Sequence, residues 1–214
     1  MSIGAVLDRF VGPHYGHPRG WLGRYAGRRM LEQHAPENDW TIALLEVLAT
    51  DRIIEIGFGG GYSISKLCQR VTHGFIAGAD YSPTMVAMAS QRNASAIKQG
   101  RLDLRCADAA ALPFETASFD KAYSIHSIYF WPQPQLALRE VWRVLKPGAK
   151  VVLTVLPKER FKTQSPDDLE ADDFKAYSGA ALQALLADAG FVRTWIEDVA
   201  SAVHLSNYSV IGIK

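Results

Sequence analysis

Three acidic residues and a run of glycines are the residues of this sequence whose types and spacing best suit ligand binding. Glu55 lies two residues before Gly57 in the segment R-I-I-E-I-G-F-G-G-G-Y, residues 52–62. Asp80 ends a second apolar segment about twenty residues after the glycines, and Asp108 follows a third. Carboxylates accept hydrogen bonds and attract positive charge. A ligand that carries both hydroxyl groups and positive charge would therefore suit this set.

The glycines predict a tight turn between a buried strand and a helix. Gly57, Gly59 and Gly61 follow a short run of β-branched residues. Because glycine has no Cβ, the backbone there can adopt positive φ and let a ligand approach closely, and the first turn of the helix offers unpaired N–H groups. Residues 53–65 contain no lysine, no arginine and no G-K-[ST] motif. A phosphate would therefore face Glu55 with no cation to offset it, which argues against a dinucleotide or a P-loop.

The three acids should meet at one edge of a parallel sheet. Strands are expected before the glycines and over residues 74–80 and 102–107, and the carboxyl ends of parallel strands share one ligand-binding crevice. Asp80 has the position at which such folds place a ribose-binding carboxylate. A nucleoside with sulfonium and ammonium charges but no phosphate suits Glu55, Asp80 and Asp108 better than NAD or ATP. S-adenosylmethionine is therefore the expected cofactor.

Short motifs in a fixed order extend this pattern from residue 52 to residue 155. They are E-I-G-F-G-G-G, A-D-Y-S-P-T-M, C-A-D-A-A-A-L-P-F, S-F-D-K-A-Y and R-V-L-K-P-G-A. As a series they resemble the motifs of class I S-adenosylmethionine-dependent methyltransferases, particularly the small-molecule branch of the ubiquinone/menaquinone-biosynthesis type. The resemblance implies that Tyr81 and Met85 lie near the cofactor. It also implies that Asp108 accepts a hydrogen bond from the adenine amino group while the backbone N–H of Ala109 faces the ring; an acid that caps a turn is the alternative.

The loop after a fourth strand, expected over residues 118–125, is the second place where reactive side chains gather. In an open α/β sheet this loop faces the crevice, so Ser124, Ile125 and His126 are expected beside the methionine part of the cofactor. His126 is a candidate catalytic base because histidine titrates near neutral pH. A histidine whose ring is bonded by backbone groups is the alternative.

Two tyrosines are the other candidate catalytic residues. Tyr129 belongs to the aromatic cluster of residues 129–131, of which some members should line a substrate pocket and others should pack against the next helix. Tyr15 lies in a stretch of the amino-terminal region that is rich in glycine, proline, aromatic residues and arginine. Such a stretch suits a lid that closes over the crevice, and a packing arm with a solvated basic face is the alternative.

The chain divides into an amino-terminal helical arm, residues 1–49, and a cofactor-binding domain, residues 50–214. In the arm, a helix is expected over residues 39–48 with an apolar face made of Trp40, Ala43, Leu44 and Val47. In the domain, strands and helices alternate, which predicts a parallel sheet with right-handed crossovers. Ser82 should cap a helix that begins at Pro83.

The remaining elements complete the expected fold. Further helices are expected over residues 62–71, 136–145 and 178–189, a fifth strand over 150–156 after a K-P-G-A turn, and β-rich segments over 192–199 and 205–213. The resembling family implies a Rossmann-like, doubly wound, seven-stranded mixed sheet with helices on both faces and the last strand antiparallel.

Length and composition describe one α/β domain. The chain has 214 residues, 48% hydrophobic and 21% charged, with a net charge of +1, so neither nucleic acid nor an anionic membrane is an expected partner. Cys68 and Cys106 have no disulfide or metal-ligand spacing and are expected to be reduced core residues. The amino-terminal segment does not read as a signal peptide and no apolar run is long enough for a membrane span, so a cytoplasmic protein is expected. No bound metal is expected, and the protein is expected to be a monomer or a homodimer.

The resemblance implies that the methyl group of S-adenosylmethionine is transferred, by in-line displacement, to a nucleophilic oxygen, nitrogen, sulfur or carbon atom of a small molecule. No N-P-P-[YF] tetrapeptide, typical of amide or base nitrogen methylation, occurs; I-H-S-I, residues 125–128, has its place. Three alternatives stay open: methylation of a protein side chain, a nicotinamide-dependent oxidoreductase, and a non-catalytic subunit that binds S-adenosylmethionine.

Overall fold

A seven-stranded sheet forms the centre of the molecule in the computed structural model, which describes residues 35–158, 174–198 and 207–214. The strand order is β3-β2-β1-β4-β5-β7-β6. The strands are β1 Arg52–Ile56, β2 Phe75–Asp80, β3 Leu102–Cys106, β4 Phe119–Ile125, β5 Leu145–Val155, β6 Arg193–Asp198 and β7 Tyr208–Ile213. The first five strands are parallel, whereas β7 runs antiparallel to β5 and β6. The predicted mixed sheet with an antiparallel last strand is confirmed.

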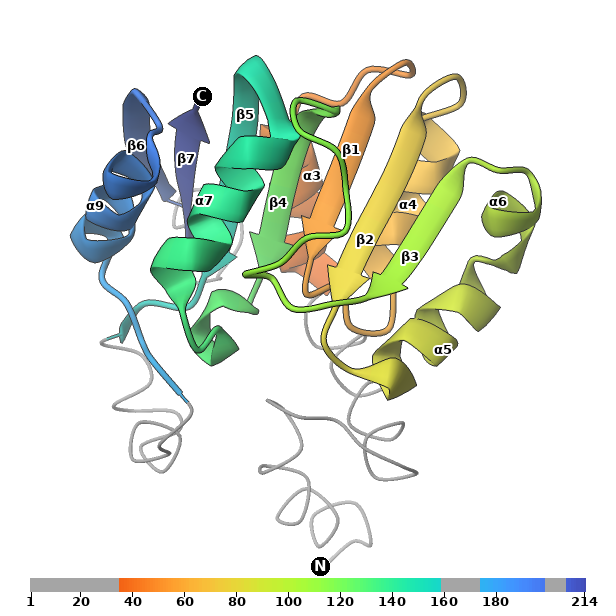
Figure 1. Cartoon of the computed structure of the whole chain (residues 1–214), viewed down its shortest axis with the longest axis horizontal. Helices are drawn as coiled ribbons and strands as arrows, with labels where there is room; N and C mark the ends of the chain where they lie inside the picture. Colours follow the sequence, from red (N-terminus) through yellow and green to blue (C-terminus); the bar gives the residue numbers. More distant parts are fainter. Residues whose placement is uncertain (1–34, 159–173, 199–206) are drawn as a thin grey trace, which may run out of the picture.

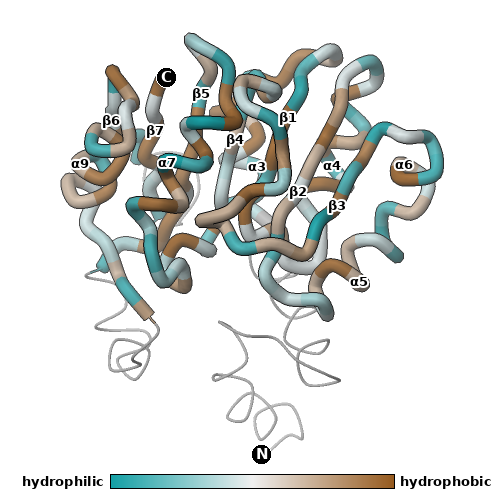
Figure 2. The backbone as a smooth tube through the Cα atoms, in the orientation of Figure 1, coloured by the Kyte–Doolittle hydropathy of each residue, from teal (hydrophilic) through white to brown (hydrophobic). Residues whose placement is uncertain are grey.

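Helices cover both faces of the sheet, as expected (Figure 1). They are α3 Ala35–Leu44, α4 Tyr62–Arg70, α5 Pro83–Arg92, α6 Ala94–Lys98, α7 Pro134–Val144 and α9 Gly179–Ala189. Helices α3 and α4 bury Ile42 and Leu67 on one face, while α7 and α9 bury Leu138 and Leu186 on the other. Figure 2 shows hydrophobic stretches along the central strands β1 and β2. None of the helices in the described residues is long and apolar enough to span a bilayer.

Capping residues in the sequence correctly predicted where helices α5 and α9 begin. Ser82 caps α5 by accepting a hydrogen bond from the Met85 backbone N–H at 3.4 Å, and Pro83 is the first helical residue. Ser178 caps α9 in the same way, and Gly190, with φ of 108°, ends that helix. Both helices begin where the sequence predicts because a capping side chain and its backbone donor are neighbours in the chain.

Helix α3 differs from the prediction in its ends and in its buried face. It spans Ala35–Leu44 rather than residues 39–48, and it buries Thr41 and Ile42 while Ala43 is exposed. The reason is a polar contact: the Thr41 hydroxyl lies 2.6 Å from the Thr154 hydroxyl on β5. The spacing of apolar residues does not predict a buried helix face whose central contact is made by a threonine.

Two further expectations about the sheet are wrong. The K-P-G-A segment is part of β5, which begins at Leu145, because a register shift between Phe119 and Lys121 on β4 lets the pairing continue past it. Cys106 is exposed rather than buried, since β3 forms an edge of the sheet and its last residues face solvent. Edge strands lack a neighbour on one side, so the hydrophobic character of a residue predicts its burial less well there.

Helix α4 depends on the conformation and small size of Gly61. Gly61 caps α4 with φ of 72°, and a Cβ there would lie 2.7 Å from the Ala89 Cβ on α5. Gly100 has a similar φ of 68°, but no atom lies within 4 Å of the position that a Cβ would take there. Alanine substitutions at the two positions would therefore distinguish the cost of backbone strain from the cost of steric overlap.

We predict that Gly61→Ala destabilises the protein by about 1 to 3 kcal/mol more than Gly100→Ala, because only the first adds overpacking to the cost of a left-handed alanine, about 1 to 2 kcal/mol. Urea unfolding followed by circular dichroism measures both losses. Equal losses for the two variants would show that contact with α5 does not constrain position 61.

Candidate functional site

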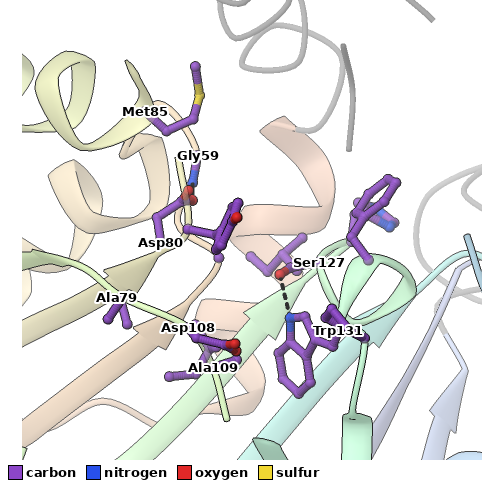
Figure 3. A pocket seen from close by; sticks show the side chains of 16 residues that line it. Gly59, Ala79, Asp80, Met85, Asp108, Ala109, Ser127 and Trp131 are labelled. Carbon is purple, nitrogen blue, oxygen red and sulfur yellow. Dashed lines mark hydrogen bonds between the residues drawn. The ribbon is translucent and has the colours of Figure 1, made fainter. Parts of the chain in front are cut away.

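A cavity of about 310 Å³ lies at the carboxyl ends of the parallel strands β1, β2, β3 and β4 (Figure 3). Its volume is in the range of small-molecule binding sites. The residues that line it are Ile56, Gly57, Gly59, Ala79, Asp80, Tyr81, Met85, Ala107, Asp108, Ala109, Ile125, His126, Ser127, Phe130, Trp131 and Pro132. The predicted crevice is therefore present, and most of the residues expected around it are brought together.

Asp80 connects the end of β2 to the glycine-rich turn. Its Oδ2 accepts a hydrogen bond from the Gly59 backbone N–H at 2.8 Å, and its Oδ1 accepts one from the Ser82 backbone N–H at 2.8 Å. Burial raises the pKa of this carboxyl above its ordinary value, and the two backbone bonds partly oppose that rise. A carboxylate has about four acceptor sites, so Asp80 can also receive hydroxyl groups of a ligand.

Asp108 and Ala109 lie side by side after β3, the strand that pairs with β2 (Figure 3). Asp108 is exposed and its Oδ1 accepts the Ala110 backbone N–H at 2.8 Å. The structure therefore combines both roles considered for this acid, because the side chain holds a turn and also lines the cavity.

Glu55 does not line the cavity, so the expected rim of three carboxylates contains only two. Its side chain is buried, and its Oε2 accepts hydrogen bonds from the Ser63 hydroxyl at 2.6 Å and the Tyr123 hydroxyl at 2.7 Å. Side chains alternate along a strand, and Glu55 faces α4 rather than the strand ends. Burial raises the pKa of Glu55 to about 7, so this acid is a partly neutral support beneath the turn.

Gly57 lies against Ser127 at the cavity wall. A Cβ on Gly57 would lie 1.9 Å from the Ser127 Oγ, and Gly57 has φ of 74°. Trp131 donates its indole N–H to the same Ser127 oxygen at 2.9 Å (Figure 3). Sequence reasoning missed Ser127; the serine four residues before a tryptophan in a short loop is a signal that could have suggested this bond.

Two other predicted cofactor residues also lie outside the cavity lining. Gly61 packs against Ala89 of α5. Ser124 is 2% exposed on β4, and its hydroxyl has no hydrogen-bond partner among the described residues. Both lie close to lining residues in sequence, but alternation along the strand and the start of α4 direct them elsewhere.

The loop after β4 divides the candidate catalytic residues. His126 lines the cavity, whereas Tyr129 is 3% exposed and does not line it. The Tyr129 ring packs against Phe174, with 5.2 Å between the two ring centroids. Phe130 and Trp131 line the cavity, as expected for some members of the aromatic cluster. Tyr15 and the stretch around it lie outside the described residues.

The charge of the cavity lining limits which ligand can bind. Asp80 and Asp108 supply carboxylates, and none of the described lining residues is lysine or arginine. Such a lining fits a ligand with positive charge and hydroxyl groups better than a phosphorylated one. Within residues 35–158, 174–198 and 207–214, no group of three His, Cys, Asp or Glu side chains could hold a metal ion.

Comparisons with known proteins agree with this chemistry. The family model described as a methyltransferase domain matches residues 54–153. The chain is 30% identical over 155 residues to the uncharacterized methyltransferase YdaC of Bacillus subtilis, covering 71% of this chain and 83% of that one. It is also 30% identical over 134 residues to the 27-O-demethylrifamycin SV methyltransferase of Amycolatopsis mediterranei, covering 63% of this chain but only 47% of that protein.

A solved structure with a similar fold is the SAM-dependent methyltransferase from Aquifex aeolicus. The TM-score is 0.66 at 18% identity, and the match covers 100% of this chain and 99% of that chain. At this identity the likeness concerns the fold alone.

We predict that Glu55 makes stability depend on pH. Its pKa is raised from 4.5 to about 7 in the folded state. The contribution of protonated Glu55 to stability is therefore fully present below about pH 4.5 and is lost as the pH rises through about 7. Glu55→Gln keeps an acceptor for Ser63 and Tyr123 but cannot ionise. Between pH 4.5 and pH 8, the free energy of unfolding of this variant should therefore rise by about 3 kcal/mol relative to that of the wild type.

Urea unfolding of both proteins across this pH range measures the difference, in which the titration of all other groups cancels. A difference that stays constant with pH would mean that Glu55 ionises at its ordinary value.

Proposed function

The chain belongs to the class I S-adenosylmethionine-dependent methyltransferases, and on this basis we propose that its methyl acceptor is a small molecule. Membership makes the protein a methyltransferase and S-adenosylmethionine its cofactor. It also decides against the nicotinamide-dependent oxidoreductase that the sequence alone left open. The identity of the acceptor does not follow from membership and depends on the shape and lining of the cavity.

The cavity supports a small acceptor. Its apolar wall of Phe130, Trp131 and Pro132, beside the residues assigned to the cofactor, suits a compact organic molecule. The Amycolatopsis relative is named for an organic acceptor that is not a protein, 27-O-demethylrifamycin SV.

The cofactor fits the lining through its charge and its hydroxyl groups. We assign Asp80 to the ribose hydroxyls, Asp108 and the Ala109 backbone to the adenine, and Gly57 and Gly59 to the backbone that approaches the amino-acid part. The flanking contacts are assigned to Tyr81, Met85 and Ile125. Glu55, Gly61 and Ser124 support these positions from outside the cavity.

The cofactor supplies an already activated methyl carbon, so the chain's own task is alignment. Walls from four strands fix the positions of cofactor and acceptor, and such positioning can contribute about 7 to 11 kcal/mol to lowering the barrier. The apolar side chains exclude water that would compete as acceptor. A proton-accepting group is needed only where the acceptor loses a proton as it attacks.

Mass spectrometry tests the acceptor class. A metabolite extract and a protein extract are each incubated with the protein and methyl-labelled S-adenosylmethionine, and heat-inactivated protein is the control. Label in small molecules supports the proposal. Label confined to proteins favours the protein-side-chain alternative, and cofactor binding without any labelled product favours a non-catalytic subunit.

We predict that Asp80→Ala weakens S-adenosylmethionine binding by about 1 to 3 kcal/mol, because the hydroxyls and the Gly59 and Ser82 N–H groups lose their acceptor. Asp103→Ala is the matched control, since Asp103 is an acid on the neighbouring strand that pairs with Arg105 at 2.9 Å away from the cavity lining. Isothermal titration calorimetry measures both affinities. Unchanged affinity in a folded Asp80→Ala protein would remove Asp80 from the site.

A further inference from the structure

The loop after β3 carries the two residues assigned to the adenine, and apolar packing holds little of it in place. This loop, residues 107–118, runs from the end of β3 toward α7 before it enters β4 (Figure 1). Asp108 and Ala109, near its start, line the cavity. Of residues 107–118, all of which the structure describes, only Leu112 is buried. Polar contacts must therefore determine most of the shape of this loop.

Backbone hydrogen bonds fix the start of the loop and close the turn that contains Asp108. The Ala107 backbone N–H donates to the Asp80 carbonyl at 3.0 Å, which attaches the loop to the end of β2. The Asp108 Oδ1 accepts the Ala110 backbone N–H at 2.8 Å. These bonds set the start and the tightness of the turn, whereas its far end depends on what holds the next residues, beginning with Leu112.

Glu140 and Arg143, two side chains of α7, hold both backbone groups of Leu112. The Glu140 Oε2 accepts the Leu112 N–H at 2.9 Å, and the Arg143 Nη2 donates to the Leu112 carbonyl at 3.0 Å. The Arg143 Nη1 also donates to the Phe114 carbonyl at 2.9 Å and to the Thr116 hydroxyl at 3.3 Å. The pair therefore attaches the loop to α7 at three of its residues.

The geometry of this pair is itself well determined. The Arg143 Nε and Nη2 donate to the two carboxylate oxygens of Glu140 at 2.7 and 2.8 Å. These hydrogen bonds hold the pKa of the Glu140 carboxyl below its ordinary value, so the pair stays charged near neutral pH. With the three bonds to the loop, Arg143 makes as many hydrogen bonds as a guanidinium has N–H donors. A lysine could not reproduce this planar arrangement.

We propose that Glu140 and Arg143 are positioning residues, which hold the loop in the shape that lets Asp108 accept a hydrogen bond from the adenine amino group. They thereby determine the preference of the site for adenine over a purine without that group. The proposal rests on the assignment of Asp108 to the adenine proposed above. Neither residue of the pair lines the cavity, so both act through the loop.

The position of Asp108 explains why its hydrogen bond to a ligand needs such support. Asp108 is exposed, and with Oδ1 bonded to Ala110 its Oδ2 has no hydrogen-bond partner among the described residues. An exposed carboxylate gains from a ligand donor only where the two are aligned, because hydrogen bonds weaken steeply with distance and angle and water is the competing donor. Without the pair on α7 the loop can take other positions, in which the amino group contributes little to binding.

Isothermal titration calorimetry of the full chain tests this role with two ligands that differ in one group. They are S-adenosylhomocysteine and its 6-deamino analogue, in which hydrogen replaces the adenine amino group. We expect the wild type to bind the analogue about 10- to 100-fold more weakly, the range for a hydrogen bond to a charged group. In Arg143→Gln this preference should fall to about threefold or less. Because no acceptor is present, the result does not depend on the acceptor class.

Three further variants separate positioning from a general loss of stability. Lys146→Gln is the matched control, since Lys146 lies three residues after Arg143, is similarly exposed and pairs with Asp120 at 2.7 Å; it should keep the preference. Arg143→Lys keeps a charge beside the carboxylate but has fewer donors, so it should lose most of the preference while placing less strain on folding. Asp108→Ala should also abolish the preference, and adding Arg143→Gln to it should cause no further loss, as expected for residues that act together.

The outcomes separate this inference from the assignment on which it rests. A folded Arg143→Gln or Arg143→Lys protein that keeps the wild-type preference overturns the inference and leaves Asp108 assigned to the adenine. A lower melting temperature with an unchanged preference has the same meaning, because it shows a structural role only. A wild type that binds both ligands equally well removes Asp108 from the adenine and overturns both.

Discussion

A single buried carboxylate holds together the parts of the molecule from which the site is built. Asp80 ends β2, accepts one backbone N–H from the turn after β1 and another from the start of α5. A carboxylate so far removed from water needs such donors to remain charged. Because no lysine or arginine is among the described residues that line the cavity, the remaining attraction of this charge is directed at whatever ligand enters. Asp80 thus both holds the turn and, together with Asp108, gives the cavity its preference for positive charge.

Sequence reasoning succeeded where neighbours in the chain determine the structure. The strand that ends at Asp80 and the helix that Ser82 and Pro83 begin follow from local patterns. Their convergence follows from a general property of parallel sheets, whose carboxyl ends share one crevice. The same logic placed Asp108 and His126 correctly at the cavity.

Reasoning from the sequence failed where a distant partner determines which way a side chain faces. Glu55 faces Tyr123, which is far away in the chain, and forms a buried hydrogen-bonded cluster under the turn. The inward face of α3 is set by the bond between Thr41 and Thr154, and Ser127 reaches the site through its contact with Gly57. Each of these depends on tertiary packing, which local propensity and periodicity do not encode.

The contact between Gly57 and Ser127 has a consequence for substitutions at position 57. A methyl group at position 57 would occupy the place of the serine oxygen, so a larger residue at position 57 would require a change at position 127. A larger residue at position 57 would displace the Ser127 oxygen and with it the acceptor of the Trp131 indole N–H. Replacement of Gly57 is therefore constrained both by its own positive φ and by the side chain at position 127.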